Sequence, residues 1–210
     1  MDQRGDQRGI FVTGTDTNVG KTVISAWLLH HSRGGYWKPI QSGLDGESDS
    51  DAVQRLSGVA AEHFHPSCYR LQAPLSPHES ARLDGVTIDL ARCQPPRSDR
   101  LLIAEGAGGV LVPLNQNDLM IDLMAQLAWP VLVVARSTLG TINHTLLTLT
   151  ALRQRGLSVI GVIMNGVPNP VNRQAISYYG RVDVVAEFPW LDQLTAATVA
   201  AVTFPERILS

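Results

Sequence analysis

The chain has 210 residues, of which 44% are hydrophobic, and its formal net charge at pH 7 is −2. These values are typical of one globular domain with a substantial core, and they give no excess of positive charge for nucleic acid or a membrane surface. The most apolar stretch, around residues 127–135, is too short to span a bilayer. We therefore expect neither nucleic acid nor a membrane among the partners of this protein.

The first nine residues repeat the sequence Asp-Gln-Arg-Gly and contain no apolar core that could act as a signal peptide. Residues 1–9 are expected to form a disordered tail, followed by a single domain over residues 10–210. The two cysteines, Cys68 and Cys93, are not in a CxxC arrangement. The sequence therefore favours reduced thiols in a cytoplasmic protein.

Short apolar runs recur along the chain, separated by segments with helical or loop character. They predict strands in six stretches, namely 10–13, 36–40, 101–104, 131–135, 159–164 and 182–185. Continuous apolar runs suit strands that are buried on both faces of a parallel sheet. Strands that alternate with helices predict an α/β fold with a doubly wound, mostly parallel sheet, which binds ligands beyond the carboxyl ends of its strands.

The clearest helix is expected to begin near Thr141 and to end before Gly156. Its predicted buried face consists of Ile142, Leu146, Leu149 and Leu152. A second helix start is predicted at residues 76–79, where Ser, Pro and Glu occupy the positions of a capping box. Residues 42–100 are the least regular and are expected to carry function-specific loops.

Residues 14–22, GTDTNVGKT, lie between a predicted strand and a predicted helix. In that setting backbone amides and the helix N-terminus can bind phosphate oxygens. The usual phosphate loop has four residues between its first glycine and the Gly-Lys pair, whereas five intervene here. The intact Gly-Lys-Thr end still predicts that Lys21 reaches the outer phosphates and that the Thr22 hydroxyl is a ligand of Mg²⁺.

The chain contains fifteen arginines but only two lysines, Lys21 and Lys38. Lysine carries a compact ammonium, whereas the arginine guanidinium is a wide planar fork. The two lysines are therefore candidates for positions that need a narrow cation.

Two segments could supply carboxylates to the phosphate site. Glu105 is expected at the end of a strand, and the small residues 106–109 after it would let the backbone approach a ligand closely. The acidic loop 45–51 offers Asp49 and Asp51, and Mg²⁺ prefers such hard oxygen ligands. The residues alone leave open which of these two aspartates is the ligand.

Eight motifs occur in the order found in the dethiobiotin synthetase family, namely VTGTDTNVGKT, YWKPIQSG, SDSDAV, APLSPH, EGAGGVLVPL, LGTINH, MNG and EFPWL. The resemblance covers residues 11–191, and the family's phosphate loop has the same longer spacing. The family uses ATP and CO₂ to convert 7,8-diaminononanoate to dethiobiotin in biotin biosynthesis, through a carbamate and a carbamic-phosphoric anhydride. The resemblance implies an enzyme, an ATP-dependent cyclo-ligase that releases ADP and phosphate.

The resemblance also implies roles for individual residues. Lys38 and Lys21 are the implied catalytic lysines, with Lys38 placed between carbamate and γ-phosphate. Ser42 and Thr17 are expected to contact the diamine. The implied ligands of Mg²⁺ are Thr22, Asp51 and Glu105. The implied ATP-binding set is Asn18, Val19, Gly20, Lys21, Thr22, Val23, Asp51, Glu105, Gly106, Ala107, Gly108, Asn165, Gly166, Pro189, Trp190 and Leu191.

Members of the family act as homodimers, and the carboxylate tail of the substrate lies near the dyad. Residues 140–144 open a predicted helix whose free amides would suit that carboxylate, although an ordinary N-cap at Thr141 explains the segment equally well. Gly166 departs from the family pattern, because some members carry a polar side chain there.

The alternative hypothesis is a non-enzymatic ATP switch, like the partition and cell-division ATPases that share this kind of sheet. Those proteins carry a lysine near the start of the phosphate loop. This chain has Asp16 at the corresponding position, five residues before Lys21. The sequence therefore favours the synthetase over the switch.

Overall fold

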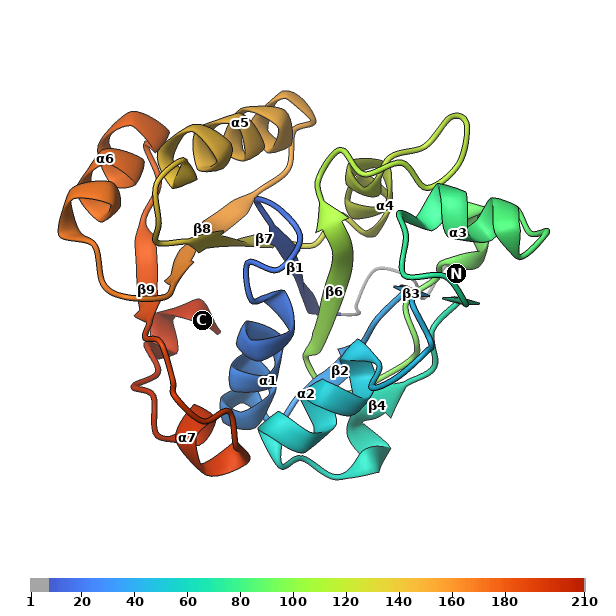
Figure 1. Ribbon diagram of the computed structural model, residues 1–210, viewed down its shortest axis with the longest axis horizontal. Coiled ribbons are helices and arrows are strands. Elements are labelled where there is room, and N and C mark those ends of the chain that lie inside the picture. The colour runs from blue at the N-terminus through green and yellow to red at the C-terminus, as the bar shows by residue number, and fades with distance from the viewer. Residues whose placement is uncertain (1–7, 210) are drawn as a thin grey trace.

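The computed structural model describes residues 8–209 (Figure 1). Most of the predicted tail lies outside the described residues, and Gly9 already belongs to the first strand. Among the described residues, no helix is long and apolar enough to cross a membrane.

A parallel sheet of seven strands forms the centre of the molecule, in the order β4-β2-β6-β1-β7-β8-β9. Its strands are β1 (Gly9–Gly14), β2 (Gly35–Trp37), β4 (Phe64–His65), β6 (Leu102–Gly109), β7 (Val131–Arg136), β8 (Val159–Asn165) and β9 (Val184–Phe188). A second, two-stranded parallel sheet pairs β3 (Ile40–Ser42) with β5 (Tyr69–Leu71). The predicted α/β class and parallel sheet are confirmed.

Helices cover both faces of the large sheet (Figure 1). They are α1 (Lys21–Ser32), α2 (Asp49–Ser57), α3 (Pro77–Leu83), α4 (Met120–Leu127), α5 (Thr141–Gln154), α6 (Pro170–Gly180) and α7 (Ala196–Ala200), with short 3₁₀ turns at Ala61–His63, Leu90–Arg92 and Glu206–Ile208. Two separate hydrophobic cores result. One contains side chains of α4, α5 and α6, and the other contains side chains of α1, α2 and α7.

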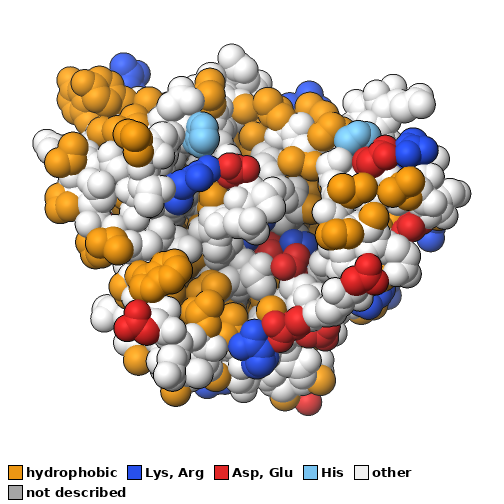
Figure 2. Space-filling view, in the orientation of Figure 1, with side chains coloured by type: hydrophobic (Ala, Val, Ile, Leu, Met, Phe, Trp, Pro, Cys, Tyr) orange, Lys and Arg blue, Asp and Glu red, His pale blue; other side chains and the backbone are white. Residues whose placement is uncertain are grey.

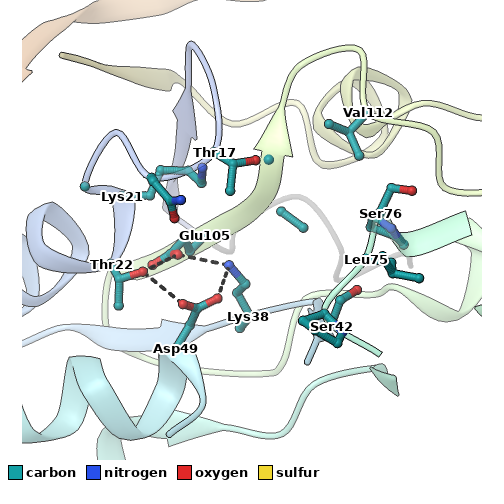
Figure 3. A pocket seen from close by; sticks show the side chains of 16 residues that line it. Thr17, Lys21, Thr22, Lys38, Ser42, Asp49, Leu75, Ser76, Glu105 and Val112 are labelled. Atoms are coloured by element: carbon teal, nitrogen blue, oxygen red, sulfur yellow. Dashed lines mark hydrogen bonds and ion pairs between the residues drawn. The ribbon is translucent and has the colours of Figure 1, made fainter. Parts of the chain in front are cut away.

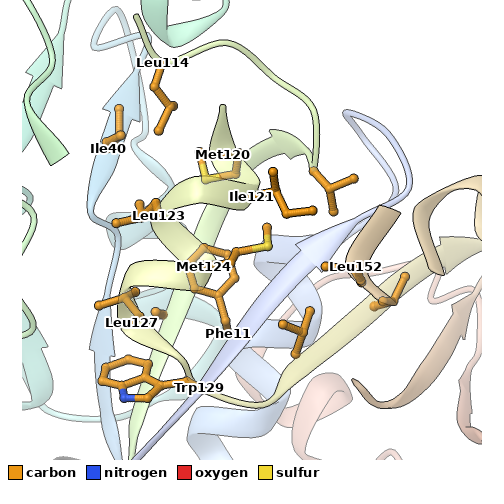
Figure 4. Close-up of a cluster of buried hydrophobic side chains, with 14 of the residues drawn as sticks. Phe11, Ile40, Leu114, Met120, Ile121, Leu123, Met124, Leu127, Trp129 and Leu152 are labelled. Atoms are coloured by element: carbon orange, nitrogen blue, oxygen red, sulfur yellow. The ribbon is translucent and has the colours of Figure 1, made fainter. Parts of the chain in front are cut away.

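The alternation of side chains along a strand explains the two cores. In β7, Val131 and Val133 point into the core with α4, whereas Leu132 and Val134 point into the core with α1. Figure 4 shows the first core, where the helix α4 lies over Phe11 of β1. Because both faces are buried, the strands read as continuous apolar runs in the sequence.

Three strand predictions need correction. The predicted strand 36–40 is two strands, β2 and β3, which belong to different sheets and are separated by Lys38 and Pro39. The segment 105–109, expected as a glycine-rich loop, continues β6 through Gly109, because β1 pairs with it as far as that residue. The last predicted strand is displaced, since β9 covers Val184–Phe188.

The predicted face of α5 was only partly right. Leu149 and Leu152 are buried, but Ile142 and Leu146 are only partly buried. The remaining buried positions of this helix are Thr141, Thr145 and Thr148. Leu146 turns toward α6, where its Cδ2 lies 3.3 Å from the position that a Cβ on Gly180 would take. The leucine pattern therefore did not give the buried face of α5 correctly, because Leu146 packs against the second helix α6.

The predicted capping box at residues 76–79 does not form, although α3 begins there with Pro77 in its first turn. The Ser76 hydroxyl lies 3.1 Å from Nδ1 of His78, and Glu79 pairs with Arg82 instead of reaching back. A capping box forms on α2, where Ser48 and Asp51 exchange hydrogen bonds.

Candidate functional site

A cleft of about 860 Å³ lies at the carboxyl ends of β1 and β6 (Figure 3). Figure 2 shows a hollow near the middle of this face, in which acidic and basic side chains lie together. The lining residues are Thr17, Asn18, Gly20, Lys21, Thr22, Lys38, Ser42, Asp49, Pro74, Leu75, Ser76, Pro77, Glu105, Ala107, Gly108 and Val112. The position agrees with the rule that parallel α/β sheets bind ligands beyond the carboxyl ends of their strands.

The loop between β1 and α1 has the backbone that phosphate binding requires. Gly20 has a φ of 99°, and a Cβ there would lie 2.1 Å from Nδ2 of Asn165, so only glycine fits. The same Nδ2 donates a hydrogen bond of 2.9 Å to the carbonyl of Val19. Asn18 also has a positive φ, of 59°, which asparagine tolerates better than most residues. The end of β8 therefore supports the loop from behind.

An ion pair joins the loop to the neighbouring strand β7. Asp16 Oδ2 accepts a hydrogen bond of 2.6 Å from Nη2 of Arg136, the last residue of β7. Asp16 Oδ1 accepts a bond of 2.7 Å from the amide of Thr17. The bulge of the longer loop is therefore fixed to the neighbouring strand.

Lys21 is the first residue of α1 and is buried, with an exposed fraction of 7%. Its Nζ donates to the carbonyl of Asp16 at 3.0 Å. Burial lowers the pKa of Lys21 to about 8, against the opposing charge of Glu105. An anion beside this ammonium would raise the pKa again.

Lys38 lies at the break between β2 and β3, and its ammonium has three acceptors. Its Nζ is 2.8 Å from Asp49 Oδ2 and 2.9 Å from Glu105 Oε1 (Figure 3). It is also 3.1 Å from the carbonyl of Gly106. Burial alone would lower the pKa of Lys38, but the carboxylates of Glu105 and Asp49 outweigh burial and raise the pKa. The side chain is therefore a fixed, fully charged cation in a nearly dry site.

The hydroxyl of Thr22 lies between the same two carboxylates. Its Oγ1 donates to Asp49 Oδ1 at 3.0 Å and to Glu105 Oε1 at 3.2 Å. The carboxylate of Glu105 is also reached from the other side by Tyr36, whose hydroxyl donates to Oε2 at 3.1 Å. Burial, followed by the charge of Glu105, raises the pKa of Tyr36 well above its usual value, so this group remains a donor.

The assignment of Asp51 to this site is corrected to Asp49. Asp49 comes at the first position of α2 and points toward Lys38 and Thr22. Asp51 is at the third position, where its Oδ2 accepts bonds from the amide and hydroxyl of Ser48 at 3.1 and 2.7 Å. These bonds lower the pKa of Asp51 and turn its carboxylate away from the cleft. Asp51 caps a helix, and Asp49 completes the site.

The oxygen atoms of Thr22, Asp49 and Glu105 fit a magnesium ion by their chemistry. Mg²⁺ is a hard cation that is commonly held by one or two carboxylates together with substrate phosphates. The described residues contain no group of three or more His, Cys, Asp or Glu side chains that could hold a metal ion alone. Two carboxylates and a hydroxyl therefore suit an ion that arrives with a nucleotide.

The other end of the cleft is less polar. Leu75 and Val112 contribute apolar lining, and Ser76 and Pro77 bring the start of α3 to the cleft, which the helix-start interpretation did not foresee. The Ser42 hydroxyl is buried there and has no hydrogen-bond partner among the described residues. An orphan hydroxyl beside an apolar wall is available to a polar group on an aliphatic ligand.

Several predicted ATP-binding residues do not line this cleft, namely Val19, Val23, Asp51, Gly106, Asn165, Gly166, Pro189, Trp190 and Leu191. Asn165 adjoins the phosphate loop through its contact with Val19. Gly166 has a φ of 128°, and a Cβ there would lie 2.6 Å from Oγ of Ser137, which explains the glycine at this departure from the family pattern. Trp190 is 73% exposed on the loop after β9.

Comparisons with known proteins agree with this geometry. A family model described as an AAA domain matches residues 8–198. The chain is 56% identical to the ATP-dependent dethiobiotin synthetase BioD of Paramagnetospirillum magneticum, over 94% of this chain and 96% of that protein. It is 49% identical to the enzyme of the same name from a Bradyrhizobium species, over 90% of this chain and 91% of that protein.

Solved structures resemble the fold at much lower identity. A ParA family ATPase from Chlorobium tepidum matches with a TM-score of 0.58 and 11% identity, covering 92% of this chain and 96% of that one. The MinC:MinD cell division complex of Aquifex aeolicus matches with a TM-score of 0.52 and 13% identity, covering 92% and 85%. These two likenesses concern the fold alone. From its sequence relatives, the chain belongs to the dethiobiotin synthetase family.

Proposed function

We propose that this protein is an ATP-dependent dethiobiotin synthetase, which carboxylates 7,8-diaminononanoate with CO₂ and closes the ureido ring with release of ADP and phosphate. One observation carries the proposal beyond family membership. A buried, fully charged Lys38 lies between two carboxylates next to a phosphate-binding loop, at the edge of a cleft with an apolar end. A cation in that position suits a reaction in which two anions must approach each other.

The reaction has three steps. One amine of the substrate attacks CO₂ and loses a proton, giving a carbamate. A carbamate oxygen then attacks the γ-phosphorus of ATP, the bond to the β-phosphate oxygen breaks, and ADP leaves. The second amine attacks the carbonyl carbon of the mixed anhydride, phosphate leaves, and loss of a proton completes the ring.

The two lysines have different tasks in this scheme. Lys21 holds the outer phosphates of ATP together with the amides of the loop. Lys38, which lines the same cleft, stabilises the negative charge shared by the carbamate and the γ-phosphate. Its contacts with Glu105 and Asp49 keep the ammonium in place before the substrates arrive.

Thr22, Asp49 and Glu105 would hold Mg²⁺, which supplies positive charge to the phosphates when it is bound. Thr17 and Ser42 would contact the diamine. Asn165 and the loop of residues 189–191 would bind the adenine, since the Asn165 Nδ2 donates to Val19 and its Oδ1 accepts no hydrogen bond from the described residues and can accept one from the base.

We also propose a cytoplasmic homodimer. The N-cap of α5 is Gly140, which has a φ of 92° and offers no side-chain cap, so Thr141 is not the cap. That helix start suits the carboxylate tail of a substrate bound by the partner subunit. Leu139, just before this helix, and Leu147, on it, are 100% and 62% exposed, so apolar side chains near this helix start are available to a partner chain. Cys68 and Cys93 are unpaired, which suits a reducing compartment.

The decisive experiment measures phosphate release from ATP with each substrate omitted in turn. Phosphate should appear only when the diamine and bicarbonate or CO₂ are both present, and ATP alone should give little turnover. Steady ATP hydrolysis that ignored the diamine but increased with DNA or lipid would contradict the proposal and favour a switch of the partition type.

A further inference from the structure

Tyr36 is a fully buried strand residue in contact with the reaction centre. It lies in the middle of β2, where it is paired with Ile103 of β6, and its side chain has an exposed fraction of 0%. Its ring packs against Phe64, with the ring centroids 5.6 Å apart. Its hydroxyl donates to Oε2 of Glu105 at 3.1 Å. The Tyr36 hydroxyl therefore contacts the Glu105 oxygen that Lys38 and Thr22 do not contact.

The two oxygens of Glu105 are divided between two sets of donors. Oε1 accepts from Lys38 at 2.9 Å and from Thr22 at 3.2 Å, so this oxygen belongs to the cleft. Oε2 accepts from Tyr36, and no other donor to it is found among the described residues. A carboxylate held by one oxygen alone can rotate, whereas one held by both oxygens keeps a single orientation.

We infer that Tyr36 is a positioning residue for the reaction, which holds Glu105 so that Oε1 faces Lys38 and Thr22. Thr22 is one of the residues that would hold Mg²⁺ together with Glu105. Tyr36 does not touch a substrate and acts only through Glu105. Partners of metal-binding carboxylates act in this way, because they fix the orientation of the ligand. This inference adds a residue to the proposed function. The test by turnover, described below, rests on that function, whereas the test by ADP binding does not.

A buried tyrosine hydroxyl can also serve packing alone, and the chain offers a control for that role. Tyr69 is buried on β5, where its hydroxyl accepts a 2.9 Å hydrogen bond from the amide of Asp89, away from the reaction centre. Tyr36→Phe and Tyr69→Phe each remove one buried hydroxyl oxygen. Only the first of them alters the support of Glu105.

The test compares the affinity for ADP with and without Mg²⁺, measured by calorimetry on the wild type and both variants. In Tyr36→Phe the gain in affinity that Mg²⁺ brings should fall about tenfold, the scale known for partners of metal ligands. Its affinity for ADP without Mg²⁺ should stay within about twofold of the wild type, since the loop amides and Lys21 are unchanged. Tyr69→Phe should match the wild type in both measurements.

Turnover and a double variant complete the experiment. With saturating diamine, bicarbonate and ATP, kcat of Tyr36→Phe should fall about tenfold, and that of Tyr69→Phe should not. In a Glu105→Gln background, Tyr36→Phe should have no further effect on the gain in ADP affinity that Mg²⁺ brings. Because ADP binding needs no diamine, it tests Tyr36 even if the proposed reaction were wrong.

Three results would overturn the inference. The first is an undiminished gain from Mg²⁺ in Tyr36→Phe together with wild-type kcat. The second is an equal loss in Tyr36→Phe and Tyr69→Phe. The third is an undiminished effect of Tyr36→Phe in the Glu105→Gln background. Either of the last two would mean that Tyr36 does not act through Glu105.

Discussion

The two sides of the cleft differ in how their cations are held. On one side, Lys38 has three acceptors within 3.1 Å, from two carboxylates and a carbonyl. On the other side, Lys21 contacts the carbonyl of Asp16 at 3.0 Å, and burial lowers its pKa to about 8. Lys38 already contacts two carboxylates before any substrate binds, whereas Lys21 has no carboxylate contact among the described residues and its pKa is lowered mainly by burial.

This difference has a chemical meaning. A preorganised cation costs no rearrangement at the moment when charge develops, so Lys38 suits the transition state. A cation short of negative charge gains most when phosphates arrive, so Lys21 suits ground-state binding of ATP. We therefore propose that catalysis depends mainly on the Lys38 side of the cleft and nucleotide affinity mainly on the loop.

Substitution of each lysine by alanine should separate the two sides most strongly. Lys38→Ala should lower kcat by about 10²- to 10³-fold, the scale of one lost electrostatic donor, and should weaken ATP binding much less than Lys21→Ala does. Lys38→Arg should restore turnover only in part, because the guanidinium is wider than the ammonium. Product formation at saturating substrates and calorimetric ATP binding would measure both effects. Near-wild-type turnover in Lys38→Ala would refute the division.

The first turn of α2 provides a matched pair of substitutions two residues apart. Asp49→Asn removes a charge that touches Lys38 and Thr22, so kcat should fall by about 10- to 10²-fold. Asp51→Asn weakens the capping box, so it should lower the free energy of unfolding by about 0.5–1 kcal/mol and leave kcat close to the wild type. Denaturant titration and steady-state kinetics on both variants would measure these effects. The opposite pattern would return the metal site to Asp51.

The loop side of the cleft could be predicted from the sequence because its residues are close together along the chain. A strand, the Gly-Lys-Thr end and a helix follow one another within a short stretch, and Lys21 and Thr22 lie where that motif predicts. The pairing of Asp16 with Arg136, which joins this loop to β7, is not local and was not predicted. The predicted α/β sheet has the same origin, since continuous apolar runs mark buried parallel strands.

The Lys38 side could be predicted only by resemblance, because its contacts join β2, α2 and β6. Thr22 and Glu105 are 83 positions apart, and Tyr36 and Glu105 are 69 apart. No periodic pattern in one sequence marks such a cluster. Asp51 was nevertheless separable from Asp49, since Ser48 three residues before Asp51 is the signature of a capping box. The same signature at residues 76–79 gave a helix start without the box, so the motif alone is not decisive.

The smallest predicted effect concerns the ion pair that fixes the longer loop. Asp16 and Arg136 are partly exposed, with side-chain fractions of 50% and 37%, so their pair should contribute no more than about 1 kcal/mol. Arg136→Met should therefore raise KM for ATP by about two- to fivefold and leave kcat within about twofold, because the pair orders the loop and does not touch the Lys38 side.

The exposed pair of Arg55 and Glu47, at 2.7 Å on α2 and the loop before it, provides the control, and Arg55→Met should leave both kinetic constants unchanged. If the pair acts only by holding the loop, Asp16→Asn added to Arg136→Met should raise KM little further, because the two substitutions break one contact. If Arg136→Met had the same KM for ATP as Arg55→Met, the ion pair would not be needed to order the loop. A rise of about a hundredfold would exceed what an exposed pair can supply and would place the guanidinium on the nucleotide itself, which would move part of the fixed charge to the loop side of the cleft.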